Sequence, residues 1–291
     1  MMQVEIDPEA GFCFGVERVI GMAEEMLDRG EEVFGLGEMV HNNAEVRRLR
    51  EKGLRTISRE EMAETRPVSI LIRAHGEPPS TYRMAGELGI GIIDGTCPIV
   101  TRLQQKIRKQ YKSMDHDTEQ LVIFGSAEHP ETIGLLGQVG GDATVVSSPD
   151  DLSRVDPSRT VHLFSQTTMD PDLFRKVELA LNERVTVEGR PSLRSNCTIC
   201  GQMKRRKPAL REFALNHDVV LFVSGRRSSN GRMLFEFCRG VNPRTYWISS
   251  QEEVDPVWFD GAVTVGISGA TSTSSLQLAS IAGHVEKLTR S

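Results

Sequence analysis

The stretch IGIIDGTCPIVTRLQQKIRKQYK, residues 90–112, contains the pattern that decides the fold. Residues 90–94 form a short apolar run, which is typical of strands that are buried on both faces of a sheet. After a turn that holds Cys97, apolar residues recur at helical spacing over residues 100–112. A buried strand followed by an amphipathic helix is the repeating unit of parallel α/β proteins.

The same alternation extends along the chain. Apolar runs rich in valine, isoleucine and leucine predict strands at 32–36, 68–74, 90–94, 120–124, 160–164, 218–223 and 263–267. Amphipathic stretches predict helices at 16–29, 100–112, 171–183 and 204–216. No low-complexity segment or linker interrupts them. We therefore expect an α/β fold with mostly parallel sheets.

Three of the five cysteines divide the chain into stretches of similar length: Cys13, Cys97 and Cys200. This spacing suggests three pseudo-symmetric α/β units in a trefoil-like arrangement, each giving one cysteine to a common centre. The predicted units are 14–97, 98–194 and 195–291, the last completed by an N-terminal strand within 1–13. An odd, sparse set of cysteines indicates metal binding or catalysis rather than a disulfide framework.

Each cysteine also has an alternative interpretation. Cys13 lies in GFCFGV and Cys97 in DGTCP, both where a strand gives way to a helix, but a buried structural thiol is about as common there as a ligand. Cys197 and Cys200 form a Cys-x-x-Cys, yet a zinc site usually needs a second pair, and the helix that follows is too basic for a thioredoxin-like motif. Cys238 lies in an apolar helical stretch and is expected in the core.

The composition excludes several classes of protein. The 291 residues carry a formal charge of -5, with 26% charged and 5% aromatic residues, as in an ordinary globular enzyme. Such a chain has no general attraction for nucleic acid or membrane, so an anionic substrate must be bound locally. No apolar run of about 18 residues and no signal peptide is recognisable, so we expect a cytoplasmic protein.

Polar residues gather just beyond the predicted strands. His41, His75 and His129 are expected to share a pocket, although each alone is as often a surface residue. Glu131 would begin a helix, as a partner for its dipole or as a proton donor in a dry pocket. Hydroxyl and amide side chains there can cap helices or bind phosphate, and these are Thr167, Thr168, Ser228, Ser229, Asn230 and Ser272. The usual nucleotide-binding fingerprints are absent.

Eight short motifs occur in the order and at the spacings of one enzyme family. They are GFCFGV (11–16), VHN (40–42), AHG (74–76), TCP (96–98), HPE (129–131), QTT (166–168), TIC (198–200) and SSN (228–230). The chain thereby resembles, over nearly its whole length, the 4-hydroxy-3-methylbut-2-enyl diphosphate reductases. These enzymes catalyse the last step of the non-mevalonate isoprenoid pathway.

The resemblance implies a 4Fe–4S cluster with three cysteine ligands, Cys13, Cys97 and Cys200, and one open iron. It implies that Glu131 relays protons, that Thr167 orients the substrate, and that a ferredoxin or flavodoxin supplies electrons. The diphosphate would be held by the remaining polar set: His41, His75, His129, Thr168, Ser228, Ser229, Asn230 and Ser272. The products would be isopentenyl and dimethylallyl diphosphate, and neither nucleic acid nor membrane would be a partner.

Departures from the family pattern cluster in the last third of the chain, at Gln202, Met203, Lys207, Arg226, Arg227 and Ser274. They leave the cysteines intact and concern the substrate pocket. A paralogue with a similar three-cysteine plan, such as quinolinate synthase, or a non-catalytic iron–sulfur sensor are the alternatives. A zinc deaminase is disfavoured because Asn196 stands where its signature requires proline.

Overall fold

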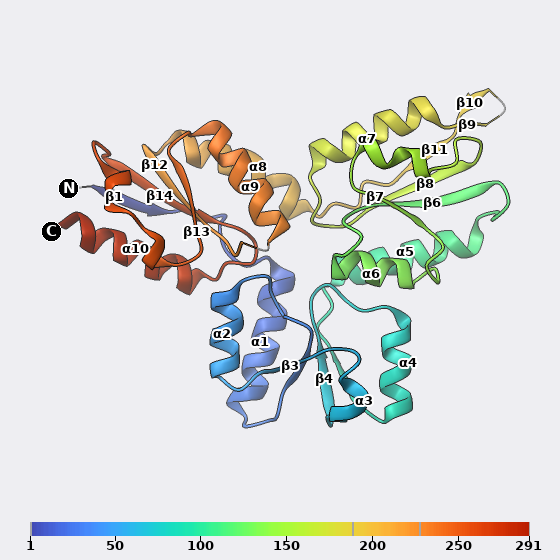
Figure 1. Ribbon diagram of the computed structural model, residues 1–291, viewed down its shortest axis with the longest axis horizontal. Helices are drawn as coiled ribbons and strands as arrows, with labels where there is room; N and C mark the ends of the chain where they lie inside the picture. Colours follow the sequence, from blue (N-terminus) through green and yellow to red (C-terminus); the bar gives the residue numbers. More distant parts are fainter. Residues whose placement is uncertain (1, 188, 227, 291) are drawn as a thin grey trace. The chain divides into compact units, whose positions relative to one another are not determined.

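The fold is given by a computed structural model that describes residues 2–187, 189–226 and 228–290 (Figure 1). The chain divides into two compact lobes. The first lobe is Met1–Thr56 together with Arg205–Ser291, and the second lobe is Ile57–Lys204. Among the described residues the chain forms three four-stranded sheets and one two-stranded sheet.

The first lobe is built around a sheet with the order β1-β14-β12-β13. Its strands are β1 (Gln3–Ile6), β12 (Val219–Val223), β13 (Thr245–Ile248) and β14 (Thr264–Gly269), and all neighbours are parallel. The N-terminal strand β1 therefore pairs with a strand near the C-terminus. Loops that follow these parallel strands meet at one edge of the sheet.

Alternation along β12 explains how this sheet is covered on both faces. Val219, Leu221 and Val223 pack with residues of α10 (Ser275–Arg290). Val220 and Phe222 pack on the opposite face against α8 (Gly201–Leu215) and α9 (Ser229–Val241) (Figure 1). Because successive side chains of a strand point to opposite faces, a continuous apolar run is what a doubly covered strand requires.

Three further elements of the first lobe are α1 (Phe14–Asp28), β2 (Phe34–Leu36) and α2 (Asn43–Glu51). Helices α1 and α2 are joined by an ion pair between Arg48 of α2 and Glu24 of α1, and Arg48 also pairs with Glu45 within α2.

The second lobe contains a parallel sheet with the order β11-β8-β6-β7. Its strands are β6 (Glu119–Phe124), β7 (Thr144–Val146), β8 (Thr160–Ser165) and β11 (Leu193–Ser195). Helices α5 (Pro98–Ser113) and α6 (Pro130–Gly137) share one apolar cluster with this sheet. Helix α7 (Pro171–Arg184) lies on the other face, where Phe174 meets Phe124 edge to face (Figure 1).

The second lobe also holds a parallel pair, β4 (Ser69–Ile72) and β5 (Gly91–Asp94), connected by α4 (Pro79–Leu88). Its shorter elements are α3 (Met62–Thr65) and a 3-10 turn at Pro149–Arg154, while β3 (Arg55–Ile57) crosses the boundary between the lobes. Two further 3-10 turns, Gln251–Glu253 and Pro256–Phe259, belong to the first lobe. The two-stranded sheet of β9 (Thr186–Val187) and β10 (Arg190–Pro191) is antiparallel.

The predicted fold class is confirmed, since the chain forms three α/β units with parallel sheets. Each strand and helix predicted from the sequence is present, with ends displaced by a few residues at most. Cys238 is fully buried in the cluster beneath α9, as expected. None of the described helices combines the length and the hydrophobicity needed to cross a bilayer.

Candidate functional site

In the second lobe a buried carboxyl group meets a buried hydroxyl group. Glu131 lies in the first turn of α6, after β6, and Thr167 follows the neighbouring strand β8. The backbone N–H of Thr167 donates to Glu131 Oε1 at 2.7 Å, and Thr167 Oγ1 donates to Glu131 Oε2 at 2.8 Å. Both residues are buried, with exposed fractions of 1% and 5%.

Burial raises the pKa of Glu131 to about 7. The two hydrogen bonds from Thr167 act in the opposite direction, because they stabilise the carboxylate. Removal from water is the larger effect in a group that is buried this completely. Glu131 can therefore hold a proton near neutral pH and release it, as a general acid must.

Two histidines lie beside this pair in the second lobe. His129 is the N-cap of α6, and its Nδ1 accepts a hydrogen bond from the Glu131 N–H at 3.2 Å. The neutral ring then carries its proton on Nε2. The His75 ring meets His129 edge to face, with ring centroids 5.1 Å apart. His75 and His129, two of the three histidines predicted to share a pocket, are thus neighbours in the second lobe. The third, His41, belongs to the first lobe.

Cys97 and Cys200 both belong to the second lobe, where they follow strands of two different sheets. Cys97 is the N-cap of α5, and its N–H donates to the Ala74 carbonyl, next to His75, at 3.0 Å. The Cys200 N–H donates to the Thr167 carbonyl at 2.9 Å. Burial raises the pKa of the Cys200 thiol, and the negative charges of Glu131 and Cys97 raise it further. Cys197, by contrast, is exposed.

Thr168 takes part in a hydrogen-bond network centred on Gln166. The Gln166 Nε2 donates to Thr168 Oγ1 at 2.7 Å, while its Oε1 accepts from Ser126 N and Thr132 Oγ1, both at 3.1 Å. Gln166 was not singled out by the sequence as more than part of the QTT motif. It fixes the loop after β8 against the start of α6, and so holds Thr167 and Glu131 in register.

In the first lobe, the turn after β14 joins two other loops. The Cys13 N–H, at the N-cap of α1, donates to the Thr271 carbonyl at 3.3 Å. Asn230 Nδ2 donates to Thr271 Oγ1 at 2.7 Å. Two buried atoms at this place have no hydrogen-bond partner among the described residues, Asn230 Oδ1 and Ser272 Oγ. Buried polar atoms of this kind are typical of a site that a polar ligand completes.

The remaining predicted residues of this loop have defined positions. Ser228 is the N-cap of α9, and its Oγ accepts from the Gly231 N–H at 3.0 Å, which is the capping role considered from the sequence. Ser229 begins α9, but its side chain lies outside the described part of the structure. Arg227 also lies outside the described residues.

Asn42 connects the His41 loop to the turn at Ser272. Its Oδ1 caps α2 by accepting from Ala44 N at 3.0 Å, and its Nδ2 donates to the Ser272 carbonyl at 3.0 Å. A side chain at Gly225 would overlap the His41 carbonyl oxygen, so the loop before α9 packs directly on the His41 backbone. Sequence reasoning missed both positioning roles, although Asn42 stood in the VHN motif.

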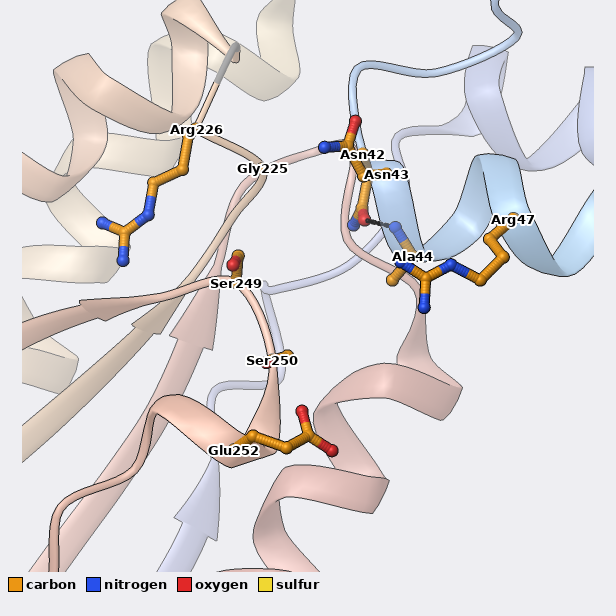
Figure 2. A pocket seen from close by; sticks show the side chains of 9 residues that line it. All are labelled: Asn42, Asn43, Ala44, Arg47, Gly225, Arg226, Ser249, Ser250 and Glu252. Carbon is orange, nitrogen blue, oxygen red and sulfur yellow. Dashed lines mark hydrogen bonds between the residues drawn. The ribbon is translucent and has the colours of Figure 1, made fainter.

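A polar cavity of about 260 Å³ opens on the first lobe beside these loops (Figure 2). It is lined by Asn42, Asn43, Ala44, Arg47, Gly225, Arg226, Ser249, Ser250 and Glu252. None of the predicted site residues lines it. Arg226, one of the departures from the family pattern, is held there by Trp247 O at 3.1 Å and by an ion pair with Glu253.

The cysteines suit an iron–sulfur cluster. Cys13 and Cys97 are N-caps, and Cys200 directly precedes α8, so each thiol lies where a helix begins. Helix N-termini stabilise thiolates and the negative charge of a bound group. Thiolate sulfur is the donor that iron–sulfur clusters use. Cys238 is unsuited because it is fully buried in the apolar core.

Comparisons with known proteins agree with the site. The family model described as LytB protein matches residues 4–286. A 4-hydroxy-3-methylbut-2-enyl diphosphate reductase of Parabacteroides distasonis is 45% identical, with 100% of both chains covered. The enzyme of that name from Bacteroides thetaiotaomicron is 43% identical, with 99% of both chains covered.

A solved structure of (E)-4-hydroxy-3-methyl-but-2-enyl diphosphate reductase, the terminal enzyme of the non-mevalonate pathway, is also similar. It has a TM-score of 0.71 and 29% identity, covering 99% of this chain and 100% of that one. Fold, motifs and relatives therefore agree, and the chain belongs to the LytB protein family.

Proposed function

We propose that this chain is a 4-hydroxy-3-methylbut-2-enyl diphosphate reductase, which converts its substrate to isopentenyl and dimethylallyl diphosphate. The observation that carries the proposal is the Glu131–Thr167 pair, which lies in the lobe that also contains Cys97 and Cys200. The carboxylate of Glu131 and the thiol of Cys97 are both near enough to Cys200 to act on its pKa. The family and its relatives support the same activity. The enzyme is thus an oxidoreductase of isoprenoid biosynthesis.

The cofactor in this proposal is one 4Fe–4S cluster held by Cys13, Cys97 and Cys200, with one iron lacking a protein ligand. The reaction consumes two electrons and two protons and releases one water. The cluster would supply the electrons one at a time. A ferredoxin or flavodoxin is the proposed source of those electrons.

The residues of the chain would supply the protons. Loss of the substrate hydroxyl as water requires a proton on the leaving oxygen, and a second proton forms the new C–H bond. Glu131 is suited to deliver protons because its pKa lies near neutrality. Thr167 Oγ1, bonded to Glu131 Oε2 at 2.8 Å, would orient the substrate and pass a proton onward, since a hydroxyl both donates and accepts.

The diphosphate would be bound by neutral donors. In the first lobe, the Ser272 hydroxyl lacks a partner and can donate to a phosphate oxygen. The Asn230 side-chain amide can rotate by 180°, so that its Oδ1 accepts a hydrogen bond from the Thr271 hydroxyl in place of the bond that its Nδ2 donates. The NH₂ group is then free to donate to a phosphate oxygen. The other proposed contacts are His41, His75, His129, Thr168, Ser228 and Ser229.

Anaerobic purification followed by iron and sulfide analysis tests the cofactor, and substrate-dependent oxidation of a reduced dye tests the reaction. We expect about four irons per chain and turnover with the hydroxymethylbutenyl diphosphate. A chain that binds stoichiometric zinc instead would end the cluster proposal. A chain that holds the cluster but does not oxidise the dye with this substrate would be an iron–sulfur protein of another kind.

A further inference from the structure

Helix α5 carries an unusual charge for this protein. It contains five basic residues and no acidic residue, in a chain whose formal charge is -5. The five are Arg102, Lys106, Arg108, Lys109 and Lys112. All of them are exposed. The outer face of α5, which we call the basic face, is therefore positive on a protein that is negative as a whole.

The basic face has no compensating acidic residues. Within the described residues none of its five cations forms an ion pair. Arg108 donates to the neutral amide oxygen of Gln138, and Lys106 lies over the Phe164 ring, 5.7 Å from its centroid. By contrast, Arg29 at the C-terminal end of α1 is paired with Glu25. Helix α8 is also basic, but it contains Glu212, whereas α5 contains no acidic residue.

This arrangement does not stabilise the helix. Lys106 and Lys109 are three residues apart, and Arg102 and Lys106 are four apart, as are Arg108 and Lys112. Like charges at these spacings face each other and repel. Arg102 also lies near the positive end of the helix dipole. Lys112, in the last turn, is favourably placed at the negative end of the dipole, but the like-charge spacings along the rest of the helix are not favoured by folding.

The basic face begins at a predicted cluster ligand. Cys97 is the N-cap of α5, and Ile99 in the first turn is an exposed apolar residue, with 43% of its surface accessible. Ile99 lies one turn before Arg102, on the same side of the helix. Further along, Gln105, Arg108, Lys109, Lys112 and Ser113 line a shallow depression.

We propose that the basic face of α5, with Ile99 at its cysteine end, is the docking surface for an acidic one-electron donor protein. A small apolar contact beside the redox centre, flanked by charge that steers the partner, suits a transient electron-transfer complex. The proposal rests on the proposed function, because only a reductase needs such a donor. Charge complementarity selects a partner with a negative surface, and the exposed apolar Ile99 beside the cysteine suits a protein partner.

The test compares two charge-reversal variants of the anaerobically reconstituted holoenzyme. The first is R102E/K106E/K109E on α5. The matched control is R175E/K176E on α7, where two exposed basic residues stand far from any cysteine in the sequence. Each is assayed with a reduced acidic 2Fe–2S ferredoxin, and separately with photoreduced deazaflavin, a small reductant that needs no docking surface.

We expect the α5 variant to raise the KM for ferredoxin at least tenfold and to lose most of its dependence on salt. Its rate with deazaflavin and its iron content should stay at the wild-type values, and the α7 control should behave as wild type. An unchanged KM and salt dependence in the α5 variant would overturn the proposal, as would an equal loss in the α7 control.

A binding measurement keeps this test independent of turnover. Titration calorimetry of oxidised ferredoxin into the holoenzyme at low salt should give a Kd that the α5 variant weakens at least tenfold. If the holoenzyme binds ferredoxin through α5 but does not reduce the diphosphate substrate, the proposed function fails while the docking surface stands. Binding that is unaffected by the α5 substitutions would refute the docking surface alone.

Discussion

Thr167 donates a hydrogen bond to each carboxylate oxygen of Glu131, one from its backbone N–H and one from its hydroxyl. A single residue thus fixes the plane of the carboxyl group. When Glu131 is protonated at Oε2, the Thr167 hydroxyl can accept that proton's hydrogen bond and turn its own hydrogen outward. The pair is therefore able to pass a proton without moving either backbone.

Substitution of Thr167 tests this relay. Thr167→Val keeps the shape and the backbone N–H bond to Glu131 but removes the hydroxyl, and kcat should fall by about 100-fold or more. Thr167→Ser keeps the hydroxyl and should retain most of the activity. Steady-state kinetics on both variants measures the loss of kcat, and the iron content of each variant serves as a control for an intact cluster. Equal kcat values for the two variants would exclude the hydroxyl from the reaction.

The pH dependence of turnover follows from Glu131. Burial raises its pKa to about 7, so the carboxyl group is protonated below that pH and loses its proton above it. A general acid acts in its protonated form, and kcat should therefore fall about tenfold per unit above about pH 7. Glu131→Gln should keep the cluster, lose most turnover and show no such fall. The same decline in the glutamine variant would assign the titration to another group.

The buried hydroxyl of Ser272 should serve the substrate rather than the fold. Its Oγ has no partner in the described part of the chain, so Ser272→Ala removes no hydrogen bond seen in the structure. We expect KM to rise about tenfold or more, as hydrogen bonds to charged groups are worth about 1.5–3 kcal/mol, with little change in Tm. Thr273→Val is the control, because the buried Thr273 hydroxyl donates to the Val223 carbonyl at 2.8 Å. It should lower Tm and leave KM near wild type.

Substitution of the two cysteines of the Cys-x-x-Cys motif tests which of them is a cluster ligand. Cys200→Ser should yield protein with little or no intact cluster, whereas exposed Cys197→Ser should keep full iron and sulfide content. Both variants are purified anaerobically and analysed for iron, sulfide and visible absorbance. Loss of iron in the Cys197 variant, with retention in the Cys200 variant, would reverse the assignment within this Cys-x-x-Cys.

Local patterns in the sequence were sufficient for the main elements of the fold. Strands such as β6 and β12 are continuous apolar runs because helices cover both faces, and that pattern is visible without a structure. The short strands β3 and β7 have three residues each, too few for any period to be recognised. The unit boundaries 14–97, 98–194 and 195–291 stay predictions.

The candidate site was less accessible to sequence reasoning where distant residues combine. His129 and Glu131 are two residues apart, so their shared helix start was visible. The hydrogen bond from the Asn42 side chain to the Ser272 carbonyl, by contrast, joins residues 230 positions apart, and no local sequence pattern predicts it. The vacant hydrogen-bonding capacity of Asn230 and Ser272 likewise depends on which neighbours the fold supplies. Motif reasoning named the candidate ligand-binding residues and missed those that hold the loops together.

The contacts of Asn42 and Gly225 have a consequence for the history of this enzyme. Because the Asn42 amide bonds the Ser272 carbonyl, and Gly225 leaves room only for the His41 backbone, three loops distant in sequence are interlocked. An insertion in any one of them displaces the other two. Natural variants and designed chimaeras should therefore exchange these loops as a set. A substitution of one loop alone that changes the substrate preference should also disturb the packing of the other two loops and lower the stability of the protein.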